Sequence, residues 1–267
     1  MGVKRLWFYI RLYPQCVARN IQAKMTYKSD FILGVAASIL MQSLGFVFIW
    51  AIFQGIPEMN GWNFYQMIFV YGMSAVALGL NEFLFAGSWR IKMHINQGTL
   101  DRLLLRPVGT LFSILTDDVG LHGLGSVMFG LAVCILSLCR LHIVLSFGKV
   151  LFWIVFMVCG SLLFLAVNII CAALAFWVTD STSVMILTQN ISEFGKYPIV
   201  IYGRKLQVFL TYVVPFAFAG YYPAAFLLGM DQNLIYWFGP VTAAVLAVTV
   251  AGLFWKFALG RYQSAGG

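Results

Sequence analysis

The chain has 267 residues, of which 61% are hydrophobic and only 10% are charged. Soluble domains carry about 25% charged residues, so this composition excludes a cytosolic enzyme, a disordered chain and a nucleic-acid-binding domain. The net charge of +8 is typical of the basic cytoplasmic loops of membrane proteins rather than of a DNA-binding face. We therefore predict an all-α polytopic membrane protein, a single transmembrane domain over residues 1–267, without nucleic acid as a partner.

Five apolar runs are long enough to cross a bilayer, which takes roughly 20 residues of helix. The runs contain few or no charged residues, and the second ends in a polar pair at Asn81 and Glu82. We predict one transmembrane helix in each run: Phe31–Phe53, Phe64–Phe85, Val119–Leu138, Val150–Val178 and Tyr236–Ala258.

A sixth crossing falls between residues 181 and 229, where the sequence permits two interpretations. By hydropathy alone, the apolar stretch Leu206–Leu228 is the fifth span, although Pro215 and Pro223 break it. Alternatively, Ser181–Lys196 crosses as a polar helix sheltered by protein, and residues 197–229 re-enter the outer leaflet. In that case Pro198, Pro215 and Pro223 mark the turns of the re-entrant segment. Both interpretations give six spans with the two termini on one side.

The distribution of Lys and Arg predicts which side that is. Twelve of the 17 basic residues lie in the N-terminal segment 1–30, the loop 86–118 and the C-terminal end, leaving at most five for the opposite face. The positive-inside rule therefore places both termini in the cytoplasm. The segment 1–30 is interpreted as interfacial, with Lys24 and Lys28 reaching lipid headgroups.

The predicted cytoplasmic loop 86–118 contains a short helix. Gly98 breaks the chain, Thr99 is the expected N-cap, Asp101 lies in the first turn, and Pro107 ends the helix. Its apolar face is formed by Leu100, Leu103 and Leu104, with Arg102 and Arg106 off that face. Such a helix either lies on headgroups or docks into a groove of a soluble partner, where the two arginines would pair with carboxylates.

Several polar residues fall at membrane depth, where they cannot cheaply face lipid. They either line a translocation pathway or form hydrogen bonds between helices. The candidate pathway residues are Glu82, Asn168, Gln189, Asn190 and Glu193.

Enzymatic chemistry has little support in the sequence. The five cysteines form no CxxC pair, and the histidines His94, His122 and His142 fall in different segments, so no metal site is predicted. A membrane-embedded enzyme such as a lipid transferase would need clustered acids or His–Asp sets, yet Asp117-Asp118 is the only acidic pair. We therefore expect no catalytic residues in this chain.

Three segments resemble a six-span bacterial branch of the ABC-2 type transporter permeases. They are Ile95–Pro107 (INQGTLDRLLLRP), Glu193–Gly229, which contains LTYVVPFAFAGYYPAAFLLG, and the ending RYQSAG at Arg261–Gly266. The sequence departs from the family pattern at Gly203, where a proline is usual, and at Gln207, where an arginine is usual. These departures concern the local geometry of one turn.

The resemblance implies a permease of the bacterial inner membrane that forms half of an export pathway. A separate ABC ATPase would drive it through a coupling helix at residues 98–107, and a second, related permease chain would supply the other half. The resemblance also implies re-entrant outer helices over residues 197–229. No GxxxxGK[ST] motif occurs, so ATP and magnesium would bind to the partner ATPase and this chain would bind no cofactor. The alternative is a secondary transporter or channel, which would work without an ATPase.

Overall fold

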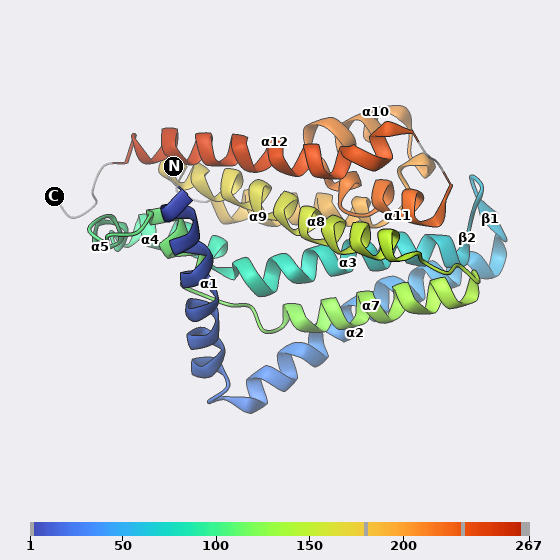
Figure 1. The fold of residues 1–267 in the computed structure, drawn as a ribbon, viewed down its shortest axis with the longest axis horizontal. Helices are drawn as coiled ribbons and strands as arrows, with labels where there is room; N and C mark the ends of the chain where they lie inside the picture. Colours follow the sequence, from blue (N-terminus) through green and yellow to red (C-terminus); the bar gives the residue numbers. More distant parts are fainter. Residues whose placement is uncertain (1–2, 179–180, 231–232, 263–267) are drawn as a thin grey trace.

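The computed structural model describes residues 3–178, 181–230 and 233–262, so the RYQSAG ending beyond Tyr262 lies outside the described residues. Five helices within that part are long and apolar enough to cross a membrane, and they extend along the length of the molecule (Figure 1). They confirm the five predicted runs, with bounds that differ by a few residues: α2 (Lys28–Gly55), α3 (Phe64–Phe85), α7 (Gly123–Arg140), α8 (Phe147–Ala173) and α12 (Leu234–Leu259).

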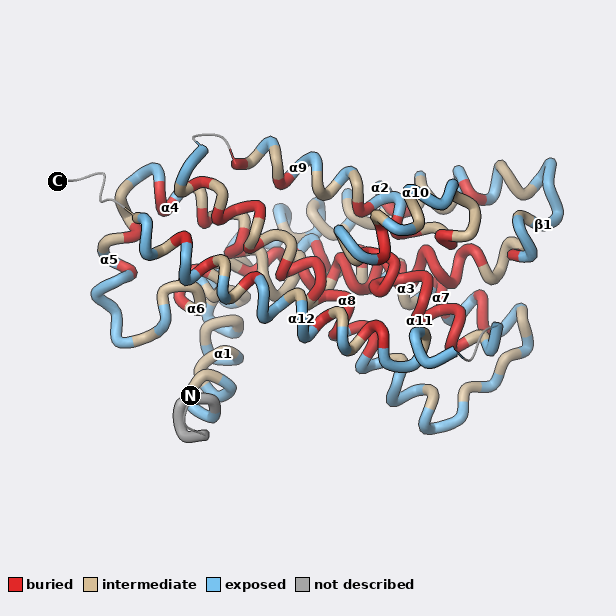
Figure 2. Tube along the Cα trace, turned by 90° about the horizontal axis from the view of Figure 1, so that it is seen from above, coloured by how far each residue is buried: buried red, intermediate tan, exposed pale blue. Residues whose placement is uncertain are grey.

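Helix α3 forms the centre of the bundle. It begins with a capping box, in which the Asn63 side chain accepts from the Gln66 N–H and the Gln66 side chain accepts from the Asn63 N–H, each at 3.0 Å. Most of the helix is buried, and Figure 2 shows the buried residues concentrated along α3 and its neighbours. Other parts of the protein therefore cover α3 on nearly every side.

Glycines let α7 approach α3 closely. A Cβ added at Gly79 would lie 2.7 Å from the Gly123 carbonyl oxygen, and one added at Gly130 would lie 2.7 Å from the Gly72 carbonyl oxygen. Small residues four positions apart permit close helix packing. Two such pairs, Ala75 with Gly79 and Ser126 with Gly130, lie at this helix contact.

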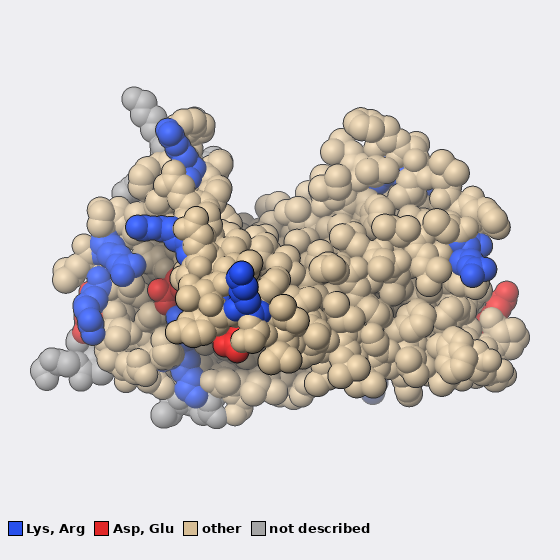
Figure 3. Space-filling view, turned by 90° about the horizontal axis from the view of Figure 1, so that it is seen from below, with Lys and Arg blue, Asp and Glu red and all other residues tan. Residues whose placement is uncertain are grey.

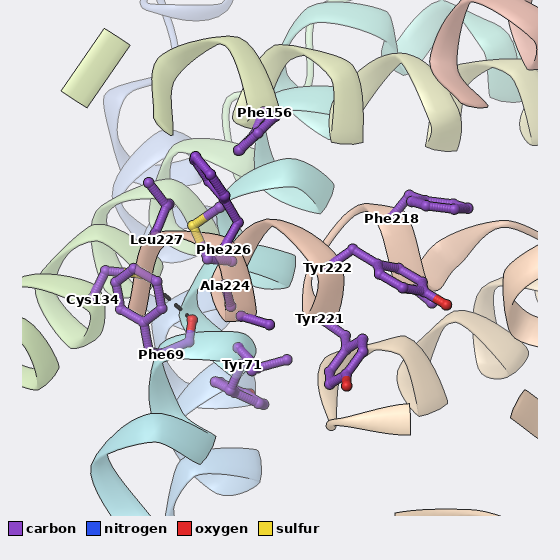
Figure 4. Packing of buried hydrophobic residues seen from close by; sticks show 14 of the residues in the cluster. Phe69, Tyr71, Cys134, Phe156, Phe218, Tyr221, Tyr222, Ala224, Phe226 and Leu227 are labelled. Atoms are coloured by element: carbon purple, nitrogen blue, oxygen red, sulfur yellow. Dashed lines mark hydrogen bonds between the residues drawn. The ribbon is translucent and has the colours of Figure 1, made fainter. Parts of the chain in front are cut away.

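Aromatic rings fill the other side of α3, toward α8 and α11 (Tyr221–Leu228). Phe156 and Phe226 meet edge to face with ring centroids 5.8 Å apart, and Phe218 stacks on Tyr222 at 4.4 Å (Figure 4). This packing fixes α11 inside the bundle rather than on its surface.

One end of the bundle carries a hairpin, β1 (Glu58–Met59) and β2 (Trp62–Asn63), paired antiparallel. Its turn residues Asn60 and Gly61 have φ of 50° and 79°, as a type I′ turn requires. A bent pair of helical segments lies at the same end (Figure 1). Its two arms, Arg204–Val213 and Phe216–Leu228, meet at 76°. The first arm joins α10 (Arg204–Val208) to a π-helical turn, and the second joins a 3-10 turn (Phe216–Phe218) to α11.

The three predicted prolines all lie in or next to this bent pair. Pro215 sits at the bend with φ −74° and ψ 43°, and the Phe216 N–H donates to the Val214 carbonyl at 2.6 Å, which forms an inverse γ-turn. Pro223 lies in the first turn of α11, where no N–H is needed, and Pro198 precedes the 3-10 turn Ile199–Ile201. Gly203, which replaces a family proline, has φ −64°, a value that a proline ring also adopts.

The residues just before the bent pair and those near its end both contact the hairpin end of the bundle. The Asn60 side chain donates to the Val200 carbonyl at 2.9 Å, and Lys149, at the start of α8, donates to the Leu227 carbonyl at 3.3 Å. The chain therefore starts at the hairpin end at residue 200 and is back at the same end by residue 227. This geometry favours the re-entrant interpretation over a continuous span at Leu206–Leu228.

The opposite end holds the short helices of the loop 86–118 and the helix α1 (Val3–Lys24), which lies across the bundle (Figure 1). After a 3-10 turn at Ala86–Arg90, the loop contains α4 (Ile91–Asn96), α5 (Leu100–Leu104) and α6 (Thr110–Leu115). Figure 3 shows Lys and Arg side chains gathered mainly at this end, with uncharged surface between the two ends. The remaining helix, α9 (Ser181–Ser192), lies beside α8 and continues as a 3-10 turn at Glu193–Lys196.

Candidate functional site

The tip of the loop 86–118 presents an exposed apolar and basic edge. Within the predicted apolar face, Leu100 and Leu103 are buried, whereas Leu104 is 42% exposed, and Leu105 after it is 87% exposed. Leu104 is the last residue of α5, which is only five residues long. Arg102, Arg106 and Pro107 are exposed beside these leucines.

Thr99 bounds α5 at its N-terminus, but its side chain does not cap the helix. Its hydroxyl lies 2.9 Å from His94 Nδ1 and donates to the His94 carbonyl at 3.4 Å. The predicted capping bond is wrong because buried His94 supplies competing partners on the preceding helix. Asp101 does lie in the first turn of α5, as the sequence predicts.

A network of ion pairs fastens the two ends of this loop to each other and to α1. Asp118 pairs with Lys24 of α1 at 2.6 Å and with Arg90 at 3.0 Å. Asp117 lies 3.3 Å from Arg90 and 3.4 Å from His94 Nε2. The acidic pair therefore has a structural role.

Neutral hydrogen bonds reinforce the attachment of α1. The Tyr13 hydroxyl donates to the Leu84 carbonyl at 2.7 Å, and Asn20 donates to the Thr116 carbonyl at 2.8 Å. Together with the ion pairs they join α1 to the inner turn of α3 and to the end of the loop. The segment interpreted as interfacial is thus bound to the loop that carries α5.

A polar cleft of about 640 Å³ opens between α2, α3, α9 and the start of α7. Three predicted pathway residues line it: Glu82 from α3, Gln189 from α9, and Glu193 from the turn that follows α9. The remaining lining residues include both polar and small apolar side chains, namely Gly34, Ala37, Ser38, Met41, Gln42, Leu78, His122, Ser126 and Lys196. The cleft therefore brings together side chains that are far apart in the sequence.

Lys196 is the most deeply buried charge of the cleft, with a side chain 7% exposed. Its ammonium lies 2.7 Å from Glu193 Oε1, donates to Gln42 Oε1 at 3.3 Å, and lies 5.5 Å from the centroid of the Tyr71 ring. The Tyr71 hydroxyl donates to Gln42 oxygens at 2.8 Å, and the Gln42 amide donates to Ser126 at 3.3 Å. These bonds join α2, α3, α7 and the turn after α9.

Sequence reasoning missed Gln42 and Lys196. Gln42 was the one amide within the apolar run of the first span, which was a usable signal because intramembrane polar groups turn inward. Lys196 ends the segment Ser181–Lys196 of the re-entrant interpretation, which expects protein to shelter it, but it was not named as a pathway residue. No sequence pattern pairs these two residues, since 154 positions separate them.

Two predicted pathway residues lie apart from the cleft. Asn168 of α8 donates to the Asn81 side chain at 3.1 Å, and Asn81 donates to the Ser161 carbonyl at 3.3 Å, so these amides hold α3 against α8. Asn168 also borders a small hollow that Glu82 and Gln189 share. Asn190 of α9 is exposed and does not line the cleft.

His122 lies at the mouth of the cleft, one residue before α7 begins, with Nε2 4.0 Å from Glu82 Oε2. Burial, followed by the charge of Lys24, lowers the pKa of His122, while Asp118 acts in the opposite direction. Across the described residues, no group of three or more His, Cys, Asp or Glu side chains is placed to hold a metal ion.

Long apolar helices around a polar cleft, with charges gathered at the two ends, define an integral membrane protein of the transport class. The model of the ABC-2 family transporter protein matches residues 39–266, which include the cleft residues from Met41 onward, the loop 86–118 and the bent pair. The chain belongs to this family, and it is a permease of an ABC transporter. Comparison with curated proteins gives no match.

Proposed function

We propose that this chain is the transmembrane subunit of an ATP-driven exporter in the bacterial inner membrane. A separate ABC ATPase binds ATP and magnesium, and a second permease chain completes the pathway. Both termini and the loop 86–118 face the cytoplasm. Family membership supports the class, and the exposed edge of α5 is the observation that supports the coupling role.

Six crossings follow in this proposal from the five long helices and the segment 181–196. The Ser74 hydroxyl, in the middle of α3, donates to the Gly195 carbonyl at 3.0 Å, so the end of that segment lies at membrane depth. The chain then extends to the hairpin end, where Asn60 binds the Val200 carbonyl. The fifth crossing is thus polar and sheltered by α3 and α8, and residues 197–229 re-enter.

The edge of α5 has the composition of a docking surface. Leu105 and Leu104 expose apolar side chains beyond the ends of the spans, in the region where basic residues gather. Exposed leucines at an aqueous face are unfavourable unless a partner groove covers them. Arg102 and Arg106 beside them provide planar donors for carboxylates of that groove.

A partner permease covers the open side of the cleft. In α2 only Gln42 and Ile49 are buried, and Asn190 of α9 exposes an amide at membrane depth. An exposed amide is costly in hydrocarbon, so a second protein chain rather than lipid is its natural neighbour. ATP-driven closure of the ATPase dimer then moves α5, and the ion pairs to Arg90 and Lys24 transmit that motion to α3 and α1.

Double charge reversal tests the docking surface. We expect Arg102→Glu with Arg106→Glu to abolish recovery of an ATPase when the tagged chain is purified in mild detergent, because carboxylates would then face carboxylates. The matched control is Arg140→Glu with Arg204→Glu, two exposed arginines at the hairpin end. Equal ATPase recovery from both double variants would refute docking at α5. Absence of any ATPase from the wild-type preparation would instead favour a secondary transporter.

Two natural cysteines test the orientation. Cys139 is exposed near the hairpin end of α7, and Cys16 is half-buried on α1 at the other end. In single-cysteine variants, a membrane-impermeant maleimide should label Cys139 from outside intact spheroplasts, and Cys16 only after the membrane is opened. The reverse order would contradict cytoplasmic termini.

A further inference from the structure

The cleft is lined by two acidic side chains, Glu82 and Glu193, and by one basic side chain, Lys196. The Lys196 ammonium is fully engaged, since Glu193 and Gln42 lie at 2.7 and 3.3 Å and only 7% of the side chain is exposed. Glu82 faces the same cleft with a side chain 18% exposed. Within the described part of the chain, the Glu82 carboxylate has no hydrogen-bond donor, and its single ion-pair contact is His122 at 4.0 Å. A sheltered carboxyl group without a donor is costly as an anion, so it favours either a proton or a cationic ligand beside it.

His122 is not a hydrogen-bond partner of this carboxyl group. Burial and the charge of Lys24 disfavour its imidazolium, which lowers the pKa of the side chain. At 4.0 Å, His122 Nε2 lies beyond hydrogen-bond distance of Glu82 Oε2. The Glu82 carboxyl group is therefore open to a cationic ligand or to a proton.

A second hollow, of about 290 Å³, adjoins the cleft through the shared lining residues Gly34 and His122. Tyr27, Asp30 and Phe31 line it near the junction of α1 and α2. A carboxylate beside aromatic rings attracts ammonium groups through both charge and the ring faces. The basic residue of this hollow, Lys24, is already paired with Asp118 at 2.6 Å. The carboxylate of Asp30 thus lies in a hollow that borders the cleft containing Glu82.

The cleft also has an apolar wall. Ala37 and Met41 of α2 face Leu78 of α3 across it. Its volume of about 640 Å³ falls within the usual range for small-molecule sites, roughly 300–1,000 Å³. An occupant can therefore place a charged group at Glu82 and an apolar body against these side chains.

We propose that the cleft binds a positively charged amphiphile, with an ammonium group at Glu82 and an apolar body against Met41 and Leu78. An anionic ligand is disfavoured because Lys196, the cation of the inner cleft, already has two partners. That this amphiphile is the exported cargo rests on the proposed function, whereas its binding does not.

The test measures binding to the full chain with its co-purified partners in lipid nanodiscs. The probe is a dansylated diaminooctane with one free amine, followed by fluorescence anisotropy, and its N-acetylated analogue serves as the uncharged comparison. We expect wild type to prefer the amine by roughly tenfold or more, as for a hydrogen bond to a charged group. Glu82→Gln should remove this preference. Glu58→Gln makes the same chemical change on the exposed hairpin and should retain it.

A second variant keeps the test decisive if Glu82→Gln does not fold. Ser38→Lys places an ammonium on the cleft wall from a partly exposed position of α2, and it should also abolish the preference. Equal binding of the amine and its acetylated analogue to wild type would overturn the proposal. Tighter binding of a dansylated fatty acid would overturn it as well, because Lys196 would then be the recognised charge.

The two proposals fail in different ways. Recovery of an ATPase without amine preference would refute the ligand class and leave the exporter subunit intact. Amine preference that depends on Glu82, in a chain that recovers no ATPase, would support the ligand class and refute the ATP-driven subunit. Stimulation of ATP hydrolysis by the amine probe, lost in Glu82→Gln, supports both.

Discussion

The contact between α3 and α7 yields a quantitative prediction. In Gly79→Ala the new Cβ would lie 2.7 Å from the Gly123 carbonyl oxygen and 2.8 Å from the Val127 nitrogen, well inside the 3.4 Å where ordinary contacts begin. Both atoms belong to the backbone of α7, so that helix itself must move. Overpacking of this kind costs about 1–3 kcal/mol. Alanine also gains about 1 kcal/mol of helix propensity over glycine, which opposes part of the loss.

Gly252→Ala is the matched control, because Gly252 lies within α12 and a Cβ there meets nothing within 4 Å. It gains the same propensity without the clash, so the difference between the two variants isolates overpacking. We expect Gly79→Ala to unfold with a free energy about 1–3 kcal/mol below that of Gly252→Ala, in SDS titrations followed by tryptophan fluorescence. Equal free energies of unfolding would show that α3 and α7 do not meet at Gly79.

Two further predictions concern charges near α1. The pKa of His122 lies below its ordinary value of 6.5 in the folded protein, so the unfolded chain binds the proton more readily as the pH falls through that value. The wild-type melting temperature should therefore decrease below pH 6.5, and it should decrease less in His122→Asn; parallel curves would contradict the lowered pKa of this side chain. Asp118→Asn removes the partner of both Lys24 and Arg90, and it should lower the free energy of unfolding by about 1 kcal/mol. The loss should shrink at high salt, where these ion pairs are screened, and a loss independent of salt would rule out an ionic origin.

Hydropathy was sufficient to predict the long helices. Each helix is a run of apolar side chains, and the thickness of the bilayer sets the length of that run. The same criterion does not decide between the two interpretations of residues 181–229. There the polar segment lies within the bundle and the apolar segment is bent at Pro215. Hydrogen bonds of Ser74 to Gly195 and of Asn60 to Val200 determine this arrangement, and they join residues more than a hundred positions apart.

The candidate site was predictable only in part, for a similar reason. Glu82, Gln189 and Glu193 are polar in apolar surroundings, which a single sequence reveals. Lys196 lies beside them, and Gln42 from the first span supplies a second oxygen for its ammonium besides that of Glu193. At the loop tip, Thr99 binds His94 instead of capping α5, since a buried imidazole competes for the hydroxyl. Which partner a hydroxyl group binds depends on the tertiary structure, and the spacing of residues in the sequence does not predict it.

The unequal burial of the helices divides the bundle into a buried frame and an exposed wall. The frame is α3 with α7 and α8, where glycine contacts and aromatic packing make any sliding costly. The wall is α2, of which only Gln42 and Ile49 are buried. Its contacts with the bundle include ring contacts of Phe46 with Phe64 and Phe129, and the bonds of Gln42 to Tyr71, Ser126 and Lys196. Through Gln42 alone, α2 is joined to α3, to α7 and to the turn after α9, so one amide ties the exposed helix to the buried ones.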